Sequence, residues 1–347
     1  MTEVMRAVVY DEYGAAPVVR DVPRPACPPD GAVVRVEATG VCRSDWHARR
    51  GHDPVPLPII PGHEFAGVVA EVGREVQGFA VGDRVTAPFV NGCGACEWCL
   101  TGQAQVCPHQ TQPGFTHDGS FAEYVVVRVA DLNLVRLPDG IDGVTAASLG
   151  CRFATAFRAV VAQARVRAGD EVAVFGCGGV GLAAIMIARA LGARVTAVDL
   201  SPDALIRAGE LGAAALVRSE TPVDEVVAAT GGGAHVTIDA LGSAATADAA
   251  VRSLRRQGRH VQVGLMLGAA ASAPLPWDRV IAWELQVSGS HGMAAADYAP
   301  MLQLIDDGRL DPARLVGRIT DLDGAAEALM AMSAPAPAGA GMVVARI

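Results

Sequence analysis

Four cysteines stand close together in the sequence, at Cys93, Cys96, Cys99 and Cys107, with the spacing C-x2-C-x2-C-x7-C. This spacing allows four thiolates of one loop to surround a single ion, as in a closed, tetrahedral structural zinc site. A closed site leaves no coordination position for a substrate. The cluster therefore predicts a bound metal, and it indicates that any chemistry takes place elsewhere in the chain.

A second set of metal-binding side chains is spread over three separate segments. Cys42 lies in GVCRSDWH, His63 and Glu64 lie in PGHEFAG, and Cys151 lies in ASLGC. Each of them alone is more often a buried or structural residue than a ligand. Together, two thiolates and one imidazole supply three protein ligands and leave a fourth position for water or substrate, as in a catalytic zinc site. Asp45 is a candidate partner that would orient the His63 ring.

A glycine pattern indicates a nucleotide site. Gly176, Gly178 and Gly181 form G-x-G-x-x-G directly after the strand-like run EVAVFG and at the start of a helical pattern. Such glycines let the backbone approach a pyrophosphate at a helix N-terminus. Asp199 follows the next strand-like run, where a carboxylate binds a ribose hydroxyl and repels a 2′-phosphate, so NAD is favoured over NADP. The alternative is a strand-to-helix turn without a ligand.

Two kinds of element must position these groups. Up to about residue 150, short Val-rich runs separated by turns predict a partly closed β-barrel. From about residue 153, strand-like and helical patterns alternate, which predicts a parallel α/β sheet. The last segment adds helical patterns and the strand-like GMVVARI, which we expect to rejoin the barrel. The predicted domains are 1–152 with 293–347, and 153–292.

Composition excludes several classes of partner. The chain has 347 residues, of which 51% are hydrophobic and 19% charged, so it can bury large cores. The formal net charge of -9 argues against nucleic acid. No apolar run approaches the roughly 20 residues of a membrane helix, and no leader pattern stands at the N-terminus. We therefore expect a cytoplasmic location, where thiols stay reduced and clustered cysteines favour metal over disulfides.

The chain resembles the zinc-dependent medium-chain alcohol dehydrogenases over almost its whole length. The segments GVCRSDWH, PGHEFAGVV, the four-cysteine loop, ASLGC and FGCGGVGL stand in the order of that family. GFTHDGSFAEY and the overall length are similar to the compact, yeast-type branch. The resemblance implies a GroES-like, partly closed β-barrel catalytic domain and a Rossmann doubly wound parallel sheet that binds NAD.

The resemblance also implies two zinc ions per chain and a proton relay. Cys42, His63 and Cys151 would bind the catalytic zinc, with Glu64 behind the metal as a transient ligand. The second zinc would be structural and would be held by Cys93, Cys96, Cys99 and Cys107. The relay would begin at Ser44, which accepts the alcohol proton, and continue through the cofactor ribose to His47 and solvent.

Further residues are implied to contact cofactor and substrate. Arg43 would bind the pyrophosphate, a task that suits its bidentate guanidinium. Trp46 and Phe89 would line the substrate pocket together with Leu265. The other implied cofactor contacts are Thr155, Gly176, Gly178, Gly179, Val180, Gly181, Asp199, Gly264 and Leu265. The sequence departs from the family in having Ala204 and Met342 where many members have a basic residue, which removes cofactor contacts.

The implied activity is reversible hydride transfer between an alcohol and NAD, giving an aldehyde or ketone, in a homo-oligomer with a tetramer favoured over a dimer. Alternatives are another zinc-dependent dehydrogenase of the polyol, threonine or formaldehyde type, and a non-catalytic nucleotide-binding member. Cys151 favours the alcohol branch, because polyol and threonine enzymes tend to have glutamate there. All 28 Lys and Arg residues are arginine, which excludes the lysine-dependent short-chain dehydrogenase and aldo-keto reductase mechanisms.

Overall fold

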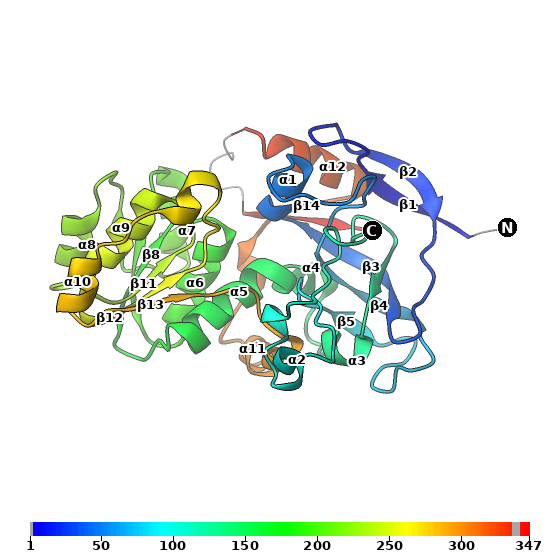
Figure 1. Ribbon diagram of the computed structural model, residues 1–347, viewed down its shortest axis with the longest axis horizontal. Helices are drawn as coiled ribbons and strands as arrows, with labels where there is room; N and C mark the ends of the chain where they lie inside the picture. Colours follow the sequence, from blue (N-terminus) through cyan, green and yellow to red (C-terminus); the bar gives the residue numbers. More distant parts are fainter. Residues whose placement is uncertain (1–2, 335–340) are drawn as a thin grey trace. The chain divides into compact units, whose positions relative to one another are not determined.

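The computed structural model describes residues 3–334 and 341–347 (Figure 1). The chain forms two compact units, one made of Met1–Ala154 with Gly292–Ile347 and the other of Thr155–His291. Among the described residues, no helix combines the length and the apolar character needed to cross a bilayer.

The first unit is built mainly from β-strands. Its strands are β1 Val4–Val9, β2 Val18–Pro23, β3 Ala32–Val41, β4 Glu64–Val72, β5 Arg84–Thr86, β6 Tyr124–Val127, β7 Val135–Arg136, β14 Val316–Thr320 and β15 Met342–Arg346. In the described part of the chain, seven of them form a sheet in the order β14-β15-β3-β4-β5-β7, with β6 paired to β3. β1 and β2 form a separate antiparallel pair.

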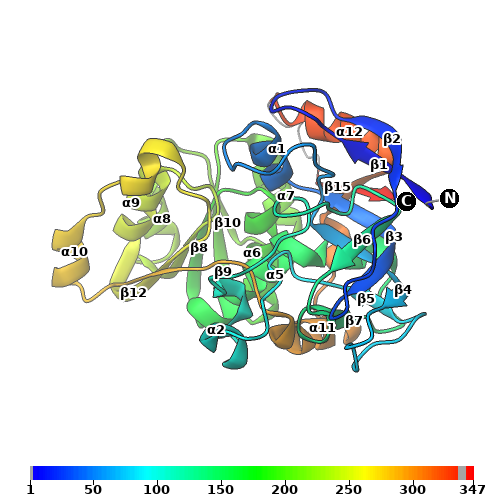
Figure 2. The same cartoon turned by 45° about the vertical axis from the view of Figure 1, so that its right-hand side comes forward.

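Short helices connect and cover these strands. They are α1 Arg43–Arg49, α2 Glu97–Leu100, α3 Ala130–Asn133, α4 Gly143–Ala147, α11 Tyr298–Asp306 and α12 Leu322–Ala331, with the π-helical turn η2 Leu149–Phe153. Figures 1 and 2 both show α12 beside β1 and β2, so segments from the two ends of the chain lie side by side. A shared apolar core joins them, including Val8, Phe121 and Leu329.

Strand β3 organises the large sheet of the first unit. One side of β3 pairs with β4, while its other side pairs with β6 near the start and with β15 near the end. Its pairing with β4 shifts between Val33 and Val34 and again between Val36 and Ala38. Such irregularities bend a strand and increase its twist. The sheet therefore curves, as the predicted partly closed barrel requires.

The second unit alternates strands and helices. Its strands are β8 Glu171–Phe175, β9 Arg194–Val198, β10 Ala215–Val217, β11 Ala234–Asp239, β12 Leu254–Gln262 and β13 Gln286–Gly289. Its helices are α6 Gly179–Ala190, α7 Pro202–Glu210, α8 Val223–Ala229, α9 Ala244–Arg252 and α10 Trp277–Ala282, and it includes the π-helical turn η3 Ala159–Gln163. The short helix α5 Ala154–Arg158 begins at the boundary between the units.

The described strands of the second unit form one parallel sheet in the order β10-β9-β8-β11-β12-β13. This order reverses beside β8, as in a doubly wound sheet. Helices α6 and α7 pack on β8 to β10, and α9 packs on β8, β11 and β12. Coverage of both faces explains why the central strands β8 and β11 are buried along almost their whole length. The predicted combination of a curved β-sheet domain and a doubly wound parallel sheet is confirmed.

Candidate metal centres and nucleotide loop

Cys42, the first candidate ligand, lies at the N-cap of helix α1. Cys42 caps the helix, and its backbone N–H donates to Asp45 Oδ2 at 2.9 Å. The other Asp45 oxygen accepts from His63 Nδ1 at 2.8 Å and from the Gly62 N–H at 3.2 Å. The Asp45 carboxylate is buried and takes three donors, so it ties the start of the helix to the segment that carries His63.

His63 presents one unpaired nitrogen to the interior. Because a carboxylate only accepts hydrogen bonds, the contact with Asp45 places a proton on His63 Nδ1, and Nε2 is the nitrogen left to bind a metal. His63 is fully buried, and its Nε2 has no hydrogen-bond partner. Burial lowers the pKa of His63, but Asp45 and Cys42 outweigh it and hold that pKa well above its usual value, so a metal that binds Nε2 would displace a proton. A buried ring nitrogen without a hydrogen-bond partner beside thiols is a metal-ligand arrangement.

The π-helical turn η2 brings Cys151 to the same place. One ligand atom from each of Cys42, His63, Glu64 and Cys151 lies within 4.8 Å of the others. The Cys42 thiol has a lowered pKa, because Cys151 hydrogen-bonds to it and His63 and Arg152 stabilise the thiolate against the effect of burial. Two sulfurs and one imidazole nitrogen fit the donor set that zinc prefers.

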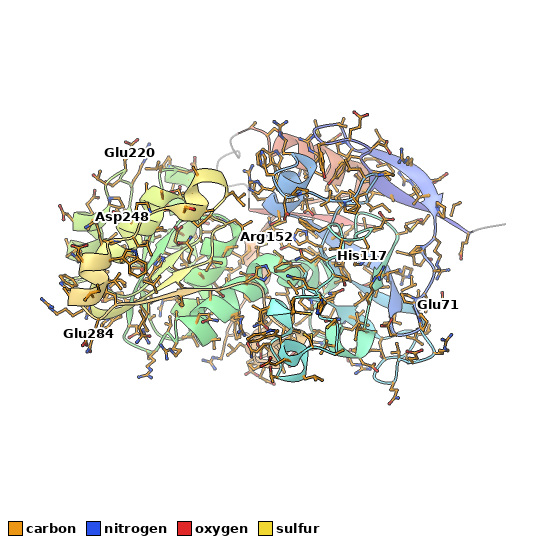
Figure 3. The ribbon with its side chains drawn as sticks, viewed as in Figure 1. Glu71, His117, Arg152, Glu220, Asp248 and Glu284 are labelled. Atoms are coloured by element: carbon orange, nitrogen blue, oxygen red, sulfur yellow. The ribbon has the colours of Figure 1, made fainter. Side chains whose placement is uncertain are left out.

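Glu64, the fourth member of this group, forms an ion pair with Arg152. Glu64 Oε1 accepts from the backbone N–H and from Nε of Arg152, each at 3.0 Å, and Oε2 accepts from Arg152 Nη2. Glu64 is fully buried, and the Arg152 side chain is 11% exposed. Arg152 is labelled in Figure 3. Desolvation raises the pKa of Glu64, against the attraction of Arg152. Both carboxylate oxygens therefore accept from Arg152, and the other three side chains remain as candidate ligands without such a partner.

The four clustered cysteines also converge. The sulfur separations are 3.5 Å for Cys96–Cys99, 3.6 Å for Cys96–Cys107 and 4.0 Å for Cys93–Cys99. These separations exceed any disulfide bond, and they bracket the about 3.8 Å expected between sulfurs around a tetrahedral zinc. Backbone N–H groups of Ala95 and Cys96 lower the pKa of Cys93 to about 6. Burial raises the pKa of Cys99, to about 12, and that of Cys107, so the sulfur separations are what fit a closed thiolate site.

The glycine loop after β8 is shaped by close backbone approach. A Cβ added at Gly181 would lie 1.8 Å from the Gly176 carbonyl oxygen, so only glycine fits where α6 starts. Gly176 itself has φ of +86°, a conformation that suits glycine. The Asp199 carboxylate accepts from the backbone N–H of Cys177 at 2.7 Å and of Ser201 at 2.8 Å. Asp199 thus holds the loop in place, a role that the sequence pattern did not indicate.

The predicted relay and pocket residues of the first unit lie around α1. Ser44 Oγ is 3.8 Å from Cys42 Sγ, and the Nδ1 atoms of His47 and His52 are 3.1 Å apart. Burial lowers the pKa of His47, and the neighbouring His52 lowers it further. The contact of Ser44 with Cys42 places its hydroxyl beside the candidate metal ligands.

Arg43, Trp46 and Phe89 have defined neighbours. The Arg43 guanidinium lies 5.0 Å above the Trp46 ring and donates to the Met332 carbonyl, and Trp46 Nε1 donates to Ser333 Oγ at 3.0 Å. The Phe89 ring centroid is 6.1 Å from that of His63, so Phe89 lies beside the candidate metal centre.

The remaining predicted residues belong to the second unit. Gly179 and Val180 begin α6 beside Gly178, and Thr155 lies in α5 and is buried. Gly264 follows β12, and its N–H donates to the Asp239 carbonyl at 2.8 Å. Leu265 is 51% exposed.

Two residues near the metal centre were not predicted from the sequence. Arg152 is the partner of Glu64, and the Phe115 ring lies 5.2 Å from that of His63. A charged residue inside the apolar run LGCRFATAF could have suggested a buried ion pair, but nothing in the pattern named its partner. Nothing in the sequence indicated that Phe115 lies beside His63, because the two residues belong to segments far apart in the chain.

Comparisons with known proteins identify the family. Residues 28–139 match the model of the alcohol dehydrogenase GroES-like domain, and residues 179–307 match that of the zinc-binding dehydrogenases. An alcohol dehydrogenase of Geobacillus stearothermophilus is 36% identical, covering 89% of this chain and 90% of the relative. A sorbitol dehydrogenase of Halalkalibacterium halodurans is 34% identical, covering 90% and 91%.

Solved structures agree with the family models. A crystal structure described as an NAD-dependent alcohol dehydrogenase is 34% identical, with a TM-score of 0.87, and the match covers 99% of this chain and 100% of that one. Sequence models, relatives and fold thus point to one family over nearly the whole chain. The chain belongs to the zinc-binding alcohol dehydrogenase family.

Proposed function

We propose that the protein is an NAD-dependent zinc alcohol dehydrogenase that interconverts an alcohol with its aldehyde or ketone. The observation that carries this proposal is the buried group of Cys42, His63 and Cys151, in which His63 Nε2 has no hydrogen-bond partner. The group offers three ligands of the kind that an open zinc site uses. Alcohol and sorbitol dehydrogenases among the relatives support the reaction class.

The side chains around this group suit such a reaction. A bound zinc would supply a Lewis acid that acidifies the alcohol, and a bound NAD would accept the hydride. Asp45 fixes the His63 ring in the orientation that keeps Nε2 directed at the thiols. Ser44, beside Cys42, would take the alcohol proton, and His47 with its lowered pKa would release it to solvent.

The second unit would bind the nucleotide. Gly176, Gly178 and Gly181 leave room for a pyrophosphate at the start of α6. Asp199 keeps unused lone pairs for a ribose hydroxyl and would repel a 2′-phosphate, which favours NAD. The other contacts would be Arg43, Thr155, Gly179, Val180, Gly264 and Leu265.

Finer assignments follow from the same family likeness. We assign residues 1–152 with 293–347 to the catalytic domain and 153–292 to NAD binding. We also propose two zincs per chain, the compact yeast-type branch, a homotetramer and a cytoplasmic location. Trp46 and Phe89 would narrow the substrate pocket and favour primary aliphatic or aromatic alcohols. A polyol substrate is the second candidate, supported by the sorbitol dehydrogenase relative.

Activity and metal content test the proposal together. With a primary alcohol and NAD, the protein should produce the absorbance of reduced nicotinamide, and Cys42→Ala should abolish it. Cys27→Ala is the matched control, because Cys27 lies outside both cysteine groups. Elemental analysis should give two zincs per chain. Full activity of Cys42→Ala would rule out the zinc mechanism, and a panel of sorbitol against primary alcohols would decide the substrate class.

A further inference from the structure

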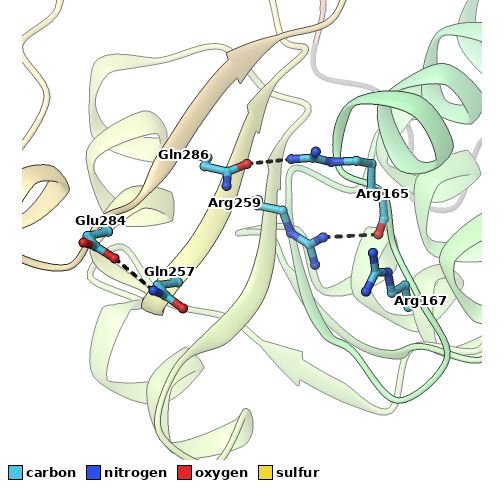
Figure 4. Close-up of a pocket in the computed structure, with 6 residues that line it drawn as sticks. All are labelled: Arg165, Arg167, Gln257, Arg259, Glu284 and Gln286. Carbon is cyan, nitrogen blue, oxygen red and sulfur yellow. Dashed lines mark hydrogen bonds between the residues drawn. The ribbon is translucent and has the colours of Figure 1, made fainter.

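The second unit has a cavity of about 510 Å³ that lies away from its glycine loop. Figure 4 shows the six side chains that line it. Arg165 precedes β8, and Gln257 lies in β12. Arg259 stands where β12 begins its continuous pairing with β11, opposite Gln286 at the start of β13. Because these strands are parallel, the cavity lies at the edge where they start, whereas the glycine loop follows the end of β8. The full lining is Arg165, Arg167, Gln257, Arg259, Glu284 and Gln286.

The lining holds three arginines and a single carboxylate, that of Glu284. Arg259 is paired with Asp170 at 3.0 Å and also donates to the Arg165 carbonyl, so its position is fixed. Arg165 donates to the Gln286 side chain at 2.6 Å, which is a neutral partner. Among the described residues, neither Arg165 nor Arg167 has a carboxylate within ion-pair distance. Like charges around one cavity repel each other unless an anion occupies it.

The backbone is strained at the same place. In the described part of the chain, four residues other than glycine have a positive φ, and three of them line this cavity. They are Arg165 at 51°, Gln257 at 59° and Glu284 at 50°. Two of these residues follow helical turns, where glycine is the usual choice. Strained backbone positions concentrate at functional sites, which supports a role for the long polar side chains that stand here.

We propose that this cavity is an anion site that takes a dianionic phosphate group, either free or as a monoester. Arg165 and Arg167 would bind the phosphate oxygens through paired N–H groups, as guanidinium groups do. The amides of Gln257 and Gln286 would donate further hydrogen bonds. Glu284, which now accepts from Gln257 at 2.9 Å, would accept from a hydroxyl group on a monoester. The site goes beyond the proposed dehydrogenase activity and does not depend on it.

Calorimetric titration with inorganic phosphate and with glycerol 3-phosphate tests this site. The titrations are run at constant ionic strength with excess NAD, so that the glycine loop is filled. We expect one phosphate per chain, and we expect Arg167→Gln and Arg165→Gln each to weaken binding about tenfold or more, because each removes a charged contact. Arg252→Gln is the matched control, since it removes the same charge from the exposed end of α9.

Two outcomes would overturn the proposal: no binding by the unmodified protein, or equal weakening in Arg252→Gln and in the two cavity variants. Circular dichroism of each variant shows that a loss of binding is not a loss of fold. If NAD itself fails to bind but the cavity variants alone lose phosphate, the anion site stands and the nucleotide assignment fails. A monoester that binds more tightly than free phosphate identifies the source of the ligand.

Discussion

At the scale of single residues, the ion pair of Arg152 with Glu64 neutralises a buried carboxylate in the candidate metal centre. Replacing Arg152 by Gln would leave a buried carboxylate without its cation, because both Glu64 oxygens depend on that side chain. We expect Arg152→Gln to lower the free energy of unfolding by about 3–5 kcal/mol, measured by denaturant unfolding in the presence of zinc.

A double variant serves as the control for this prediction. Arg152→Gln with Glu64→Gln removes both charges together and should lose much less stability than Arg152→Gln alone. Equal losses in the single and double variants would show that the pair is not an electrostatic unit.

The residue types in the sequence predicted much of this site, but the sequence did not predict which residues pair with one another. Cys42, His63 and Cys151 were identified because their ligand chemistry is specific, and the contact expected between Asp45 and His63 is present at 2.8 Å. The partner of Glu64 stands 88 positions away in the sequence. Periodicity and local motifs report neighbours along the chain, so a pairing at that separation becomes visible only after folding.

The junction of β8 with α6 is the element whose geometry the nucleotide proposal depends on. A methyl group at Gly181 would collide with the Gly176 carbonyl, whereas nothing lies within 4 Å of a Cβ at Gly178. We therefore expect Gly181→Ala to lose both stability and NAD binding. Gly178→Ala should lose NAD binding while its stability changes by less than about 1 kcal/mol.

Fluorescence titration with reduced nicotinamide and thermal unfolding measure the two effects separately. Gly178→Ala acts only if a ligand approaches the backbone there, which makes it the sharper of the two variants. Unchanged cofactor affinity in Gly178→Ala would contradict the placement of the pyrophosphate.

The alternation of strands with helices was predictable for the second unit because buried parallel strands are continuous apolar runs. The π-helical turn that carries Cys151 was not, since one extra residue in a helical turn leaves no mark in a hydrophobic pattern. The register shifts along β3 were not predictable from the sequence either, because each depends on how β3 pairs with β4.

The two proposed metal sites should make separable contributions at the scale of the whole molecule. Cys99 is buried within the four-cysteine loop, whose ligands all come from one short segment. We expect Cys99→Ser to lose one zinc per chain and to lower the free energy of unfolding by about 4 kcal/mol or more, because a structural metal stabilises the folded state directly.

Metal analysis, calorimetry and activity below the unfolding temperature check this outcome together. The second zinc and the activity should remain in Cys99→Ser, whereas Cys42→Ala should lose activity with little change in the loop. Loss of both zincs in Cys99→Ser would show that the sites are not independent.

The discontinuity of the first unit has a consequence during protein synthesis. β15 pairs with β3, and Ala345 lies opposite Thr39, about 300 residues earlier in the chain. At typical rates of 5–20 residues per second, a ribosome needs roughly 15–60 s to supply that partner. The second unit is continuous and can fold in the meantime, while part of the β3 edge stays unpaired and open to association. We therefore expect the growing chain to be most exposed to aggregation before β15 emerges.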